Sequence, residues 1–186
     1  MRETLTKGIA MSSGVENIKL GACDVTFGDV SLGLTKGGVE VEVTTDTHEV
    51  KVDQFGETTV SERIMGRNIK VKVPMVETDI AKITAVMPGS TIDAGQKALI
   101  VKVGEGIDLV KLAQALVLTP RNKDDYSVTI PRAATAGSMS FAYKHNEERV
   151  FELEFTAYPD STGHLMTVGG TAAGTLVKQS TAKTAK

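Results

Sequence analysis

The 186-residue sequence contains no tryptophan, a single cysteine and only 4% aromatic residues. One cysteine cannot build an internal disulfide framework, and such usage fits a protein made in a reducing cytoplasm. Cys23 alternates with Val25 and Phe27, which predicts a buried small apolar residue and not a nucleophile. Sugar-binding modules depend on stacked rings, so the scarcity of aromatic residues argues against a glycan-binding role.

An excess of charge of one sign is also missing, since the formal net charge is −2 and the pI is about 5.9. Tight nucleic-acid binding leaves a basic footprint in a sequence, and this one has none. No apolar run approaches the ~18 residues of a membrane span, and residues 1–17 lack the apolar segment of a signal peptide. We therefore expect a soluble protein without a membrane anchor.

Alternating apolar residues, typical of β-strands, dominate what is present. The longest patterned stretch, residues 37–74, holds two such runs around a polar, glycine-bearing loop and predicts a long β-hairpin. Pairing about Glu57 sets Val41 against Val73, Val43 against Val71 and Glu42 against Lys72. This register gives a valine face and an acid–base face.

The apolar parity of this hairpin slips once in each run. A side-chain period of two cannot absorb an odd offset. We therefore expect β-bulges or bends near residues 44–49 and 65–68.

One segment, "VETDIAKITAVMPG", has a helical period. Thr78 is the expected N-cap, Asp79 lies in the first turn, and Pro88 with Gly89 ends the helix. Further strands are expected in "KALIVKVG", "YSVTIP" and "HLMTV", whereas "LVKLAQALVLTP" suits either a helix or a buried strand.

A second hairpin is expected in "SMSFAYKHNEERVFELEFTAYPD", across a "KHNEE" turn. Its predicted cross-strand pairs are Met139–Phe155, Phe141–Leu153 and Tyr143–Phe151. The fold class is therefore mainly β: a β-sandwich or partly closed barrel with a long β-hairpin and one α-helix. One domain, residues 18–170, lies between an N-terminal arm (1–17) and a C-terminal tail (171–186).

Two groups of chemically active residues were weighed as sites. Asp46, His48 and Glu49 offer metal-ligand types, but in a strand Glu49 faces away from the other two and no second histidine is near. Asp160, Ser161 and His164 hold the residue types of a hydrolase triad, yet "PDSTGH" is better explained as a turn. We expect no catalytic residue, no cofactor and no metal site, and hence no enzyme.

The loop of the long hairpin, "DQFGETTVSE", carries Phe55 beside Gly56. An exposed ring at the end of a long hairpin suits a docking element; the alternative is that Phe55 folds back onto its own domain. An extended hairpin exposes strand edges that neighbouring chains can pair with. Contacts of this one-sided kind generate rings or helical filaments.

The order of elements resembles that of the major tail tube proteins of long-tailed, siphovirus-type bacteriophages. The resemblance covers about residues 20–170. The stretches that carry it are "DVTFGDVSLGLTKGGVEVEVTTDTHEVKVDQFGETTVSERIMGRNIKVKVPMVE", "ALVLTPRN", "YSVTIPRAA" and "ERVFELEFTAYPD".

The resemblance implies a tail tube fold whose inner sheets join around a hexameric ring, with rings stacked into a hollow tube that conducts DNA during ejection. Residues 39–53 and 62–73 would supply strands of the lumen, with polar side chains facing it: Glu40, Glu42, Asp46, Lys70 and Lys72. The loop would reach a neighbouring ring or subunit through Asp53, Gln54, Phe55, Gly56, Glu57, Thr58, Thr59 and Arg63.

A DNA conduit must not bind its cargo, so both lysines are expected to be neutralised by cross-strand acids. The implied partners are other copies of the chain, the tape measure protein, the tail terminator and tail-tip proteins. DNA would pass without specific binding. The implied location is the virion tail, assembled in the host cytoplasm.

Two alternatives stay open at this point. A contractile-tail or type VI secretion-like tube protein would share the fold, although the hairpin favours a sheathless tube. From a different class, a monomeric all-β ligand-binding module would fit the strand pattern; ligand-dependent stabilisation would mark it.

Overall fold

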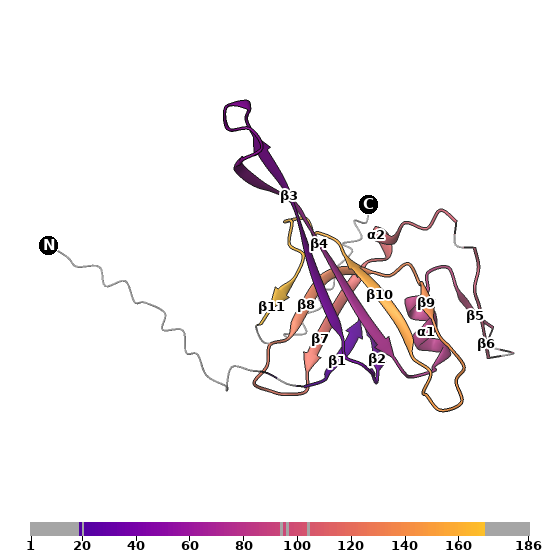
Figure 1. Ribbon diagram of the computed structural model, residues 1–186. Helices are drawn as coiled ribbons and strands as arrows, with labels where there is room; N and C mark the ends of the chain where they lie inside the picture. The colour runs from indigo at the N-terminus through magenta and orange to yellow at the C-terminus, as the bar shows by residue number, and fades with distance from the viewer. Residues whose placement is uncertain (1–18, 20, 94, 96, 104, 170–186) are drawn as a thin grey trace, which may run out of the picture.

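The computed structural model describes residues 19, 21–93, 95, 97–103 and 105–169. The chain is mainly β, as predicted, and Figure 1 shows a strand-rich body from which one long hairpin projects. The predicted arm and tail, residues 1–17 and 171–186, lie outside the described residues.

The main sheet is antiparallel and runs in the order β2-β1-β7-β8-β10-β4-β3. These strands are β1 (Cys23–Phe27), β2 (Val30–Gly33), β3 (Glu40–Lys51), β4 (Thr59–Met75), β7 (Gln114–Pro120), β8 (Val128–Ala134) and β10 (Phe151–Ala157). Two short strands extend the sheet: β9 (Met139–Ser140) pairs with β10, and β11 (Thr167–Val168) pairs with β8.

The chain after β2, at one end of this sheet, bridges to the last residues of β4, next to the strand at the other end. Thr35 pairs with Met75, and the Lys36 N–H donates to the Pro74 carbonyl at 3.1 Å. The sheet therefore curls into a partly closed barrel, as the sequence predicts. Closure of this kind lets the inward faces of the barrel strands share a single interior.

That interior is filled by alternate apolar residues of the strands. The fully buried ones include Val25, Leu32, Val71, Val73, Leu116, Ile130, Leu153 and Phe155. The rings of Phe27 and Phe155 meet with centroids 5.1 Å apart. Each buried side chain of this size contributes about 1.5–3 kcal/mol relative to an exposed one. Because Val71 and Val73 are among the buried residues, the valine face predicted for the hairpin is part of the core at the hairpin's inner end.

A carboxylate clasp fixes the barrel closure. Glu77 accepts a hydrogen bond from the Leu34 N–H at 2.9 Å and pairs with Lys82. The hydrogen bond from Lys82, followed by the one from Leu34, lowers the pKa of the Glu77 carboxyl. Gly33 next to it has φ +81°, and a Cβ there would lie 2.2 Å from Glu77 Oε1. Only glycine fits this position.

The long hairpin forms, but with a register two residues from the predicted one. Val41 lies opposite Val71 and Glu42 opposite Lys70, where Val73 and Lys72 were expected. The turn centres on Phe55 and not on Glu57. An error of two residues preserves the faces, because side chains alternate with a period of two.

The predicted bulge is present, and it lies in β4. Asp46 pairs with Gly66 and Thr47 with Ile64, so Met65 is the extra residue. This matches both expected ranges with a single bulge. A second bulge, which the pattern did not predict, leaves Val60 unpaired between the Val50 and Lys51 pairings.

The predicted helix is α1 (Ile80–Val86), which buries Ile83 and Val86. Its N-cap is Asp79 and not Thr78, since the Asp79 carboxylate accepts from the Ala81 N–H at 3.0 Å. The segment "LVKLAQALVLTP", for which a helix and a strand were both expected alternatives, contains one of each: a four-residue helix, α2 (Leu109–Leu112), followed by the strand β7. The sequence predicted one α-helix, and the structure has a second one, the single turn α2.

The second hairpin pairs two residues from the prediction, with Met139 opposite Leu153 and Ser140 opposite Glu152. Strand pairing stops there, and residues 141–150 form an open loop. The strand expected in "KALIVKVG" is shorter than predicted. It is β6 (Ala98–Ile100), which pairs with β5 (Thr91–Asp93) in a separate two-stranded sheet.

Candidate assembly surfaces

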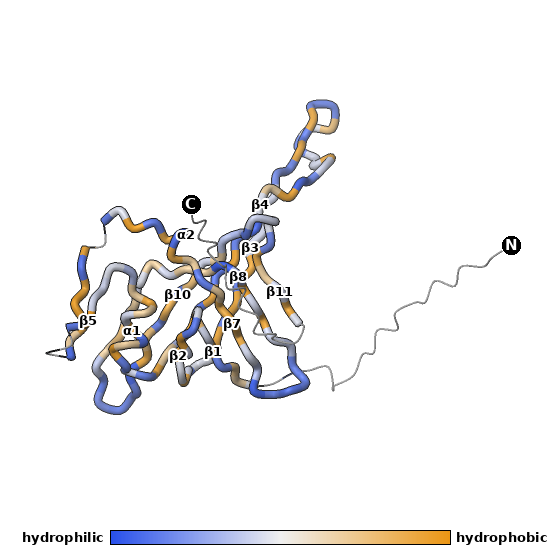
Figure 2. The backbone as a smooth tube through the Cα atoms, turned by 180° about the vertical axis from the view of Figure 1, so that it is seen from behind, coloured by the Kyte–Doolittle hydropathy of each residue, from blue (hydrophilic) through white to orange (hydrophobic). Residues whose placement is uncertain are grey.

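The outer part of the hairpin, residues 44–68, stands beyond the barrel, and we call it the ribbon. β10 pairs with β4 only from Met75 to Lys70, so the ribbon has no third strand. None of its residues is buried. Figure 2, from behind, shows apolar stretches interleaved with polar ones along it.

Large apolar side chains of the ribbon face solvent. Phe55 is 66% exposed and Met65 70% exposed, and Ile64 and Val60 are exposed as well. A monomer gains nothing from such exposure, whereas a binding surface uses it. The alternative that Phe55 folds back onto its own domain is wrong.

The tip of the ribbon is a compact turn. The short 3-10 helix η2 (Asp53–Phe55) is closed by the Phe55 N–H, which donates to the Val52 carbonyl at 3.0 Å. Gly56 then takes φ +60°, a value that favours glycine. The turn therefore holds Phe55 at the far end of the molecule.

Both edges of the ribbon are free within the described part of the chain. β3 has no partner other than β4, and β4 has none on its other side from Thr59 to Ile69. Unpaired edges of this length are rare in monomeric proteins because they template pairing with other chains.

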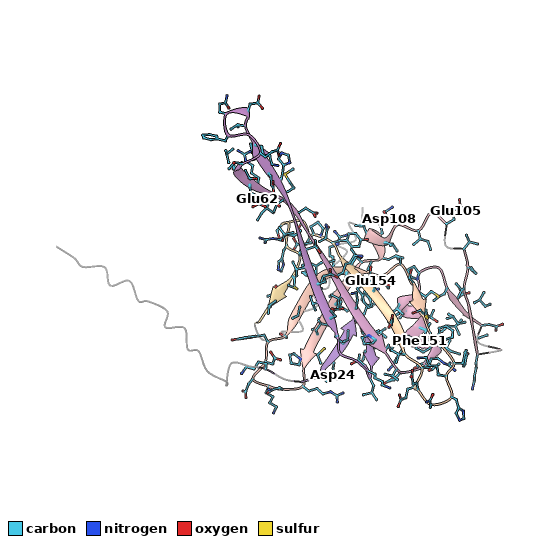
Figure 3. All side chains as sticks on the ribbon, viewed as in Figure 1. Asp24, Glu62, Glu105, Asp108, Phe151 and Glu154 are labelled. Carbon is cyan, nitrogen blue, oxygen red and sulfur yellow. The ribbon has the colours of Figure 1, made fainter. Side chains whose placement is uncertain are left out.

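The solvent face of the inner hairpin carries a ladder of ion pairs. Lys72 Nζ lies 3.1 Å from Glu40 and 4.0 Å from Glu42, and Lys70 Nζ lies 2.9 Å from Glu154 of β10. The hydrogen bond and charge of Glu40, with the charge of Glu42, raise the pKa of Lys72. Figure 3 labels Glu154 on β10, beside the inner part of the hairpin.

Both lysines are therefore paired with acids, as expected, but Lys70 uses an acid of β10 that the hairpin pattern alone could not supply. Asp46 lies further along β3 than Glu40 and Glu42, and its carboxylate accepts a hydrogen bond from Asn68 Nδ2 at 3.1 Å. Glu152 of β10 is exposed too. Carboxylates thus outnumber lysines on this face.

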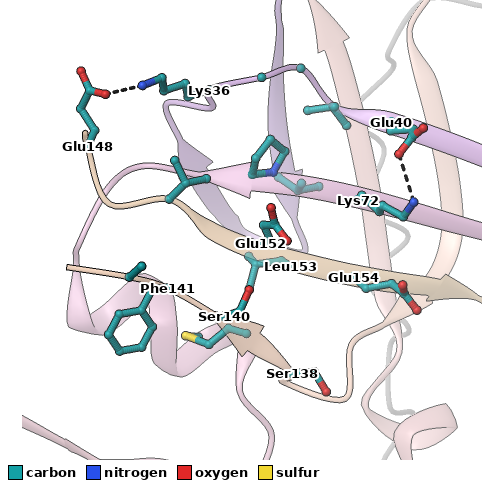
Figure 4. A pocket seen from close by; sticks show the side chains of 18 of the residues that line it. Lys36, Glu40, Lys72, Ser138, Ser140, Phe141, Glu148, Glu152, Leu153 and Glu154 are labelled. Carbon is teal, nitrogen blue, oxygen red and sulfur yellow. Dashed lines mark hydrogen bonds and ion pairs between the residues drawn. The ribbon is translucent and has the colours of Figure 1, made fainter. Parts of the chain in front are cut away.

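A groove of about 1260 Å³ opens at the end of this face away from the ribbon. Figure 4 shows its floor on β4 and β10 and the ion pair of Lys36 with Glu148 at one wall. Lys144 and Glu147 pair on the same loop at 2.5 Å. The carboxylates of Glu40, Glu147, Glu148, Glu152 and Glu154 outnumber the lysines that line it.

An aromatic surface, which we call the platform, is formed by Phe141, Tyr143 and Arg149 in the β9–β10 loop. The Arg149 guanidinium lies 3.9 Å from the Tyr143 ring centroid and 5.8 Å from that of Phe141. Phe141 packs on the core residue Phe151 with centroids 5.1 Å apart. Phe141 is 48% and Tyr143 78% exposed. Sequence reasoning placed both rings in a strand and so missed this cluster.

A third exposed apolar surface lies on β5, β6 and the segment that follows, residues 91–93 and 98–103. Ile92, Ile100, Val101 and Val103 are exposed there, and Val103 is 96% exposed. The alternating pattern that predicted a strand through Val103 is real, but no strand in the described chain pairs with residues 101–103. We call this segment the flap.

The two sites that the sequence analysis set aside have ordinary structural roles. Asp160 anchors the predicted turn, since its Oδ1 accepts from the N–H groups of Thr162 and His164 at 2.8 and 2.9 Å. Hydrogen bonds, the Thr162 hydroxyl first, lower the pKa of Asp160 to about 2. Asp46 and His48 lie on the exposed ribbon. The described residues contain no group of three or more metal-ligating side chains, and no described helix is long and apolar enough to span a membrane.

No family model and no curated protein matches the sequence. Among solved structures, the tube-terminating cap of the anti-feeding prophage matches 91% of this chain and 100% of its own, at 13% identity and a TM-score of 0.50.

The chain shares the fold of this tube-terminating cap. Two structures of PVC, an extracellular contractile injection system, align as well. A chain of its sheath–tube complex is 11% identical, with coverage of 86% and 100% and a TM-score of 0.47. A chain of its sheath/tube terminator is 12% identical, with coverage of 87% and 100% and a TM-score of 0.45.

Proposed function

We propose that this chain is the structural subunit of a phage-tail-like tube, which assembles as stacked hexameric rings and conducts DNA during ejection. The observation that carries the proposal is the ribbon. It has two free edges and exposed apolar side chains, and it extends a barrel with the fold of a tube-terminating cap. These features cost a monomer stability and solubility and serve an assembly.

In this proposal the free edge of β3 continues the sheet into a neighbouring subunit, and the ion-pair face lines the channel. Glu40, Glu42, Asp46, Lys70 and Lys72 would face the lumen. The charge pattern supports this assignment, because each lysine is held by a carboxylate and the carboxylates are in excess. DNA phosphates would meet no free cation on this ladder and would slide.

The tip of the ribbon would form the contact between rings. Its residues are Asp53, Gln54, Phe55, Gly56, Glu57, Thr58 and Thr59, with Arg63 on the adjoining strand. All are exposed. Partners beyond other copies would be the tape measure, terminator and tip proteins of a sheathless tail, assembled in the host cytoplasm and carried in the virion.

A second candidate is a terminator that closes a tube, favoured by the anti-feeding prophage cap. A terminator contributes one ring at the end of a tube, whereas a tube subunit must bind copies of itself on both sides. Assembly of the isolated chain separates these two candidates.

The test is electron microscopy of the purified chain across a concentration series, with its mass in solution measured by light scattering. We expect hollow rings that stack into tubes with a continuous channel. Single rings that never stack would support the terminator. An oligomer without a channel, or a monomer under all conditions including addition of a pre-formed tube end, would overturn the proposal.

A further inference from the structure

We propose that the ribbon tip of one copy docks on the platform of a second copy, with Phe55 against Tyr143 and Phe141 and with Asp53 facing Arg149. The inference rests on the proposed tube function and names the receiving surface for the contact between rings. It starts from two surfaces that one chain cannot bring together.

The tip and the platform lie at opposite ends of the molecule. The ribbon tip comes directly after Lys51, the last residue of β3. Residues 36–39, which come directly before Glu40, the first residue of β3, line the groove beside the platform. Twelve residues of strand span about 40 Å. Figure 1 shows the ribbon tip at one extreme of the molecule and the loop between β9 and β10 at the other. Contact between them therefore requires two molecules.

Each surface offers what the other lacks. Phe55 is an exposed ring without an aromatic neighbour in the described structure, and Tyr143 presents an exposed ring beside Phe141. Aromatic rings and arginine are the residue types that dominate binding energy at protein interfaces. A third ring added to the platform would extend the existing edge-on contact between Phe141 and Tyr143, whose centroids are 5.9 Å apart.

The charges at the two surfaces are also complementary. No carboxylate of the described residues pairs with Arg149, and its Nε atom is buried without a hydrogen-bond partner. Asp53 at the tip takes part in none of the side-chain ion pairs found among the described residues, and Glu57 beside it is held by Lys51 at 2.9 Å. Arg149 as a whole is only half-buried, so its guanidinium, which already stacks on Tyr143, would meet an acid from outside the chain through its Nη atoms and not through the buried Nε.

The other exposed surfaces fit the tip less well. The groove shares Phe141 with the platform, but the rest of its lining carries an excess of carboxylates, which would repel Asp53 and Glu57. The flap offers aliphatic side chains but no ring. The platform combines rings with an unpaired cation.

The contact is heterologous, because tip and platform are different surfaces of one chain. A copy that is bound through its tip still presents its platform, and the reverse, so binding propagates from molecule to molecule. A terminator would need only one of the two. Possession of both ends is what a repeating tube subunit requires.

Site-specific cross-linking of the full chain tests the proposal. In a Cys23→Ala background, Gln54→Cys in the tip and His145→Cys in the platform loop place one thiol on each side of the contact, and a short bismaleimide joins cysteines in assembled protein. We expect a ladder of covalent trimers, tetramers and longer products, because each copy links to two others. The matched control replaces His145→Cys by Val103→Cys on the flap and should give little product.

A charge exchange supplies the second readout. Asp53→Arg and Arg149→Asp should each raise the concentration at which stacked assemblies form by roughly tenfold or more, and the double variant should recover most of the loss. Arg149→Lys, which keeps the charge, shows whether folding of the loop is affected, and circular dichroism checks each variant.

The outcomes separate this inference from the proposed function. Tubes that cross-link at Val103 and not at His145, or tubes in which the charge exchange gives no recovery, would overturn the tip–platform contact and leave the tube. Failure of the unmodified chain to form any channelled assembly would overturn the tube itself, and the contact with it.

Discussion

The inner and outer halves of β4 contrast sharply, although both belong to one uninterrupted strand. In the inner half Val71, Val73 and Met75 are completely buried, while in the outer half Ile64 and Met65 face solvent. The two halves contain similar apolar residue types, so composition does not separate them. What differs is the third strand: β10 covers β4 up to Lys70 and no further. Burial here depends on neighbouring strands and not on local sequence.

The comparison teaches that the barrel stabilises the monomer and the ribbon does not. A two-stranded hairpin is marginal in water, and the ribbon persists because β4 is anchored in the core at its other end. Substitutions in the barrel should therefore change folding, and the same substitutions in the ribbon should change only assembly. The following predictions test this division.

The largest contrast is expected between two phenylalanines. Phe155→Ala removes a fully buried ring that packs on Phe27, and should lower the free energy of unfolding by about 3–5 kcal/mol. Phe55→Ala at the exposed tip should stay within about 0.5 kcal/mol. Urea unfolding of the monomer measures both. A large loss for Phe55→Ala would show that the ribbon contributes to the fold of the monomer.

The next contrast concerns two glycines. Gly33→Ala forces a side chain onto φ +81°, at a cost of about 1–3 kcal/mol of backbone strain, and its Cβ would lie 2.2 Å from Glu77 Oε1, so the clasp must open as well. Gly66→Ala in the ribbon meets nothing within 4 Å and has no positive φ, so it should be close to neutral. Thermal unfolding compares them, and equal destabilisation would contradict the role of the clasp.

A smaller effect is expected from acid. Folding depresses the pKa of Asp160 to about 2 from its ordinary 3.8, so its contribution is present above about pH 4 and is lost as pH falls toward 2. Asp160→Asn should therefore lower stability near neutrality, and its difference from the unmodified chain should shrink in this window. Asp53→Asn, at the ribbon tip, is the control and should leave the profile unchanged. A difference that is constant with pH would argue against the linkage.

The smallest effect on stability is expected from the ion-pair ladder. Exposed ion pairs are screened by solvent and contribute little to stability, so a Glu40→Gln, Glu42→Gln and Glu154→Gln variant should unfold almost as the unmodified chain does. Its freed lysines should bind duplex DNA at low salt, detected by gel retardation that disappears as salt rises. Replacing Lys70 and Lys72 by Gln as well should abolish the retardation. Retardation by the unmodified chain would count against a conduit role.

Much of this arrangement can be predicted from the sequence, because the alternation of valines with charged residues fixes which side chains share a face. The faces survive a register error of two residues, and both hairpins show such an error. The error in the long hairpin has a physical source. The turn centres on Phe55, which alone would shift the pairing by four residues, and the bulges at Met65 and Val60 add two residues to β4 and so reduce the error to two.

Contacts between distant segments could not be predicted in the same way. The acid that holds Lys70 comes from Glu154, 84 positions away. The platform was not predicted, because the spacing of Phe141 and Tyr143 is also that of a strand. In the structure the strand pairing ends after Ser140, so both rings lie in a loop and are exposed. Alternation states which residues share a face but not whether another strand covers them.

The continuity of β4 also has a mechanical consequence. The strand runs without a break from the exposed Thr59 to the buried Met75, so any force applied to the ribbon along its length is delivered to the barrel interior. The hydrogen bonds from β4 to β10 lie across such a pull, and they are loaded together and not one after another. β4 thus transmits a pull on the ribbon to the barrel, where Val71, Val73 and Met75 anchor it in the core.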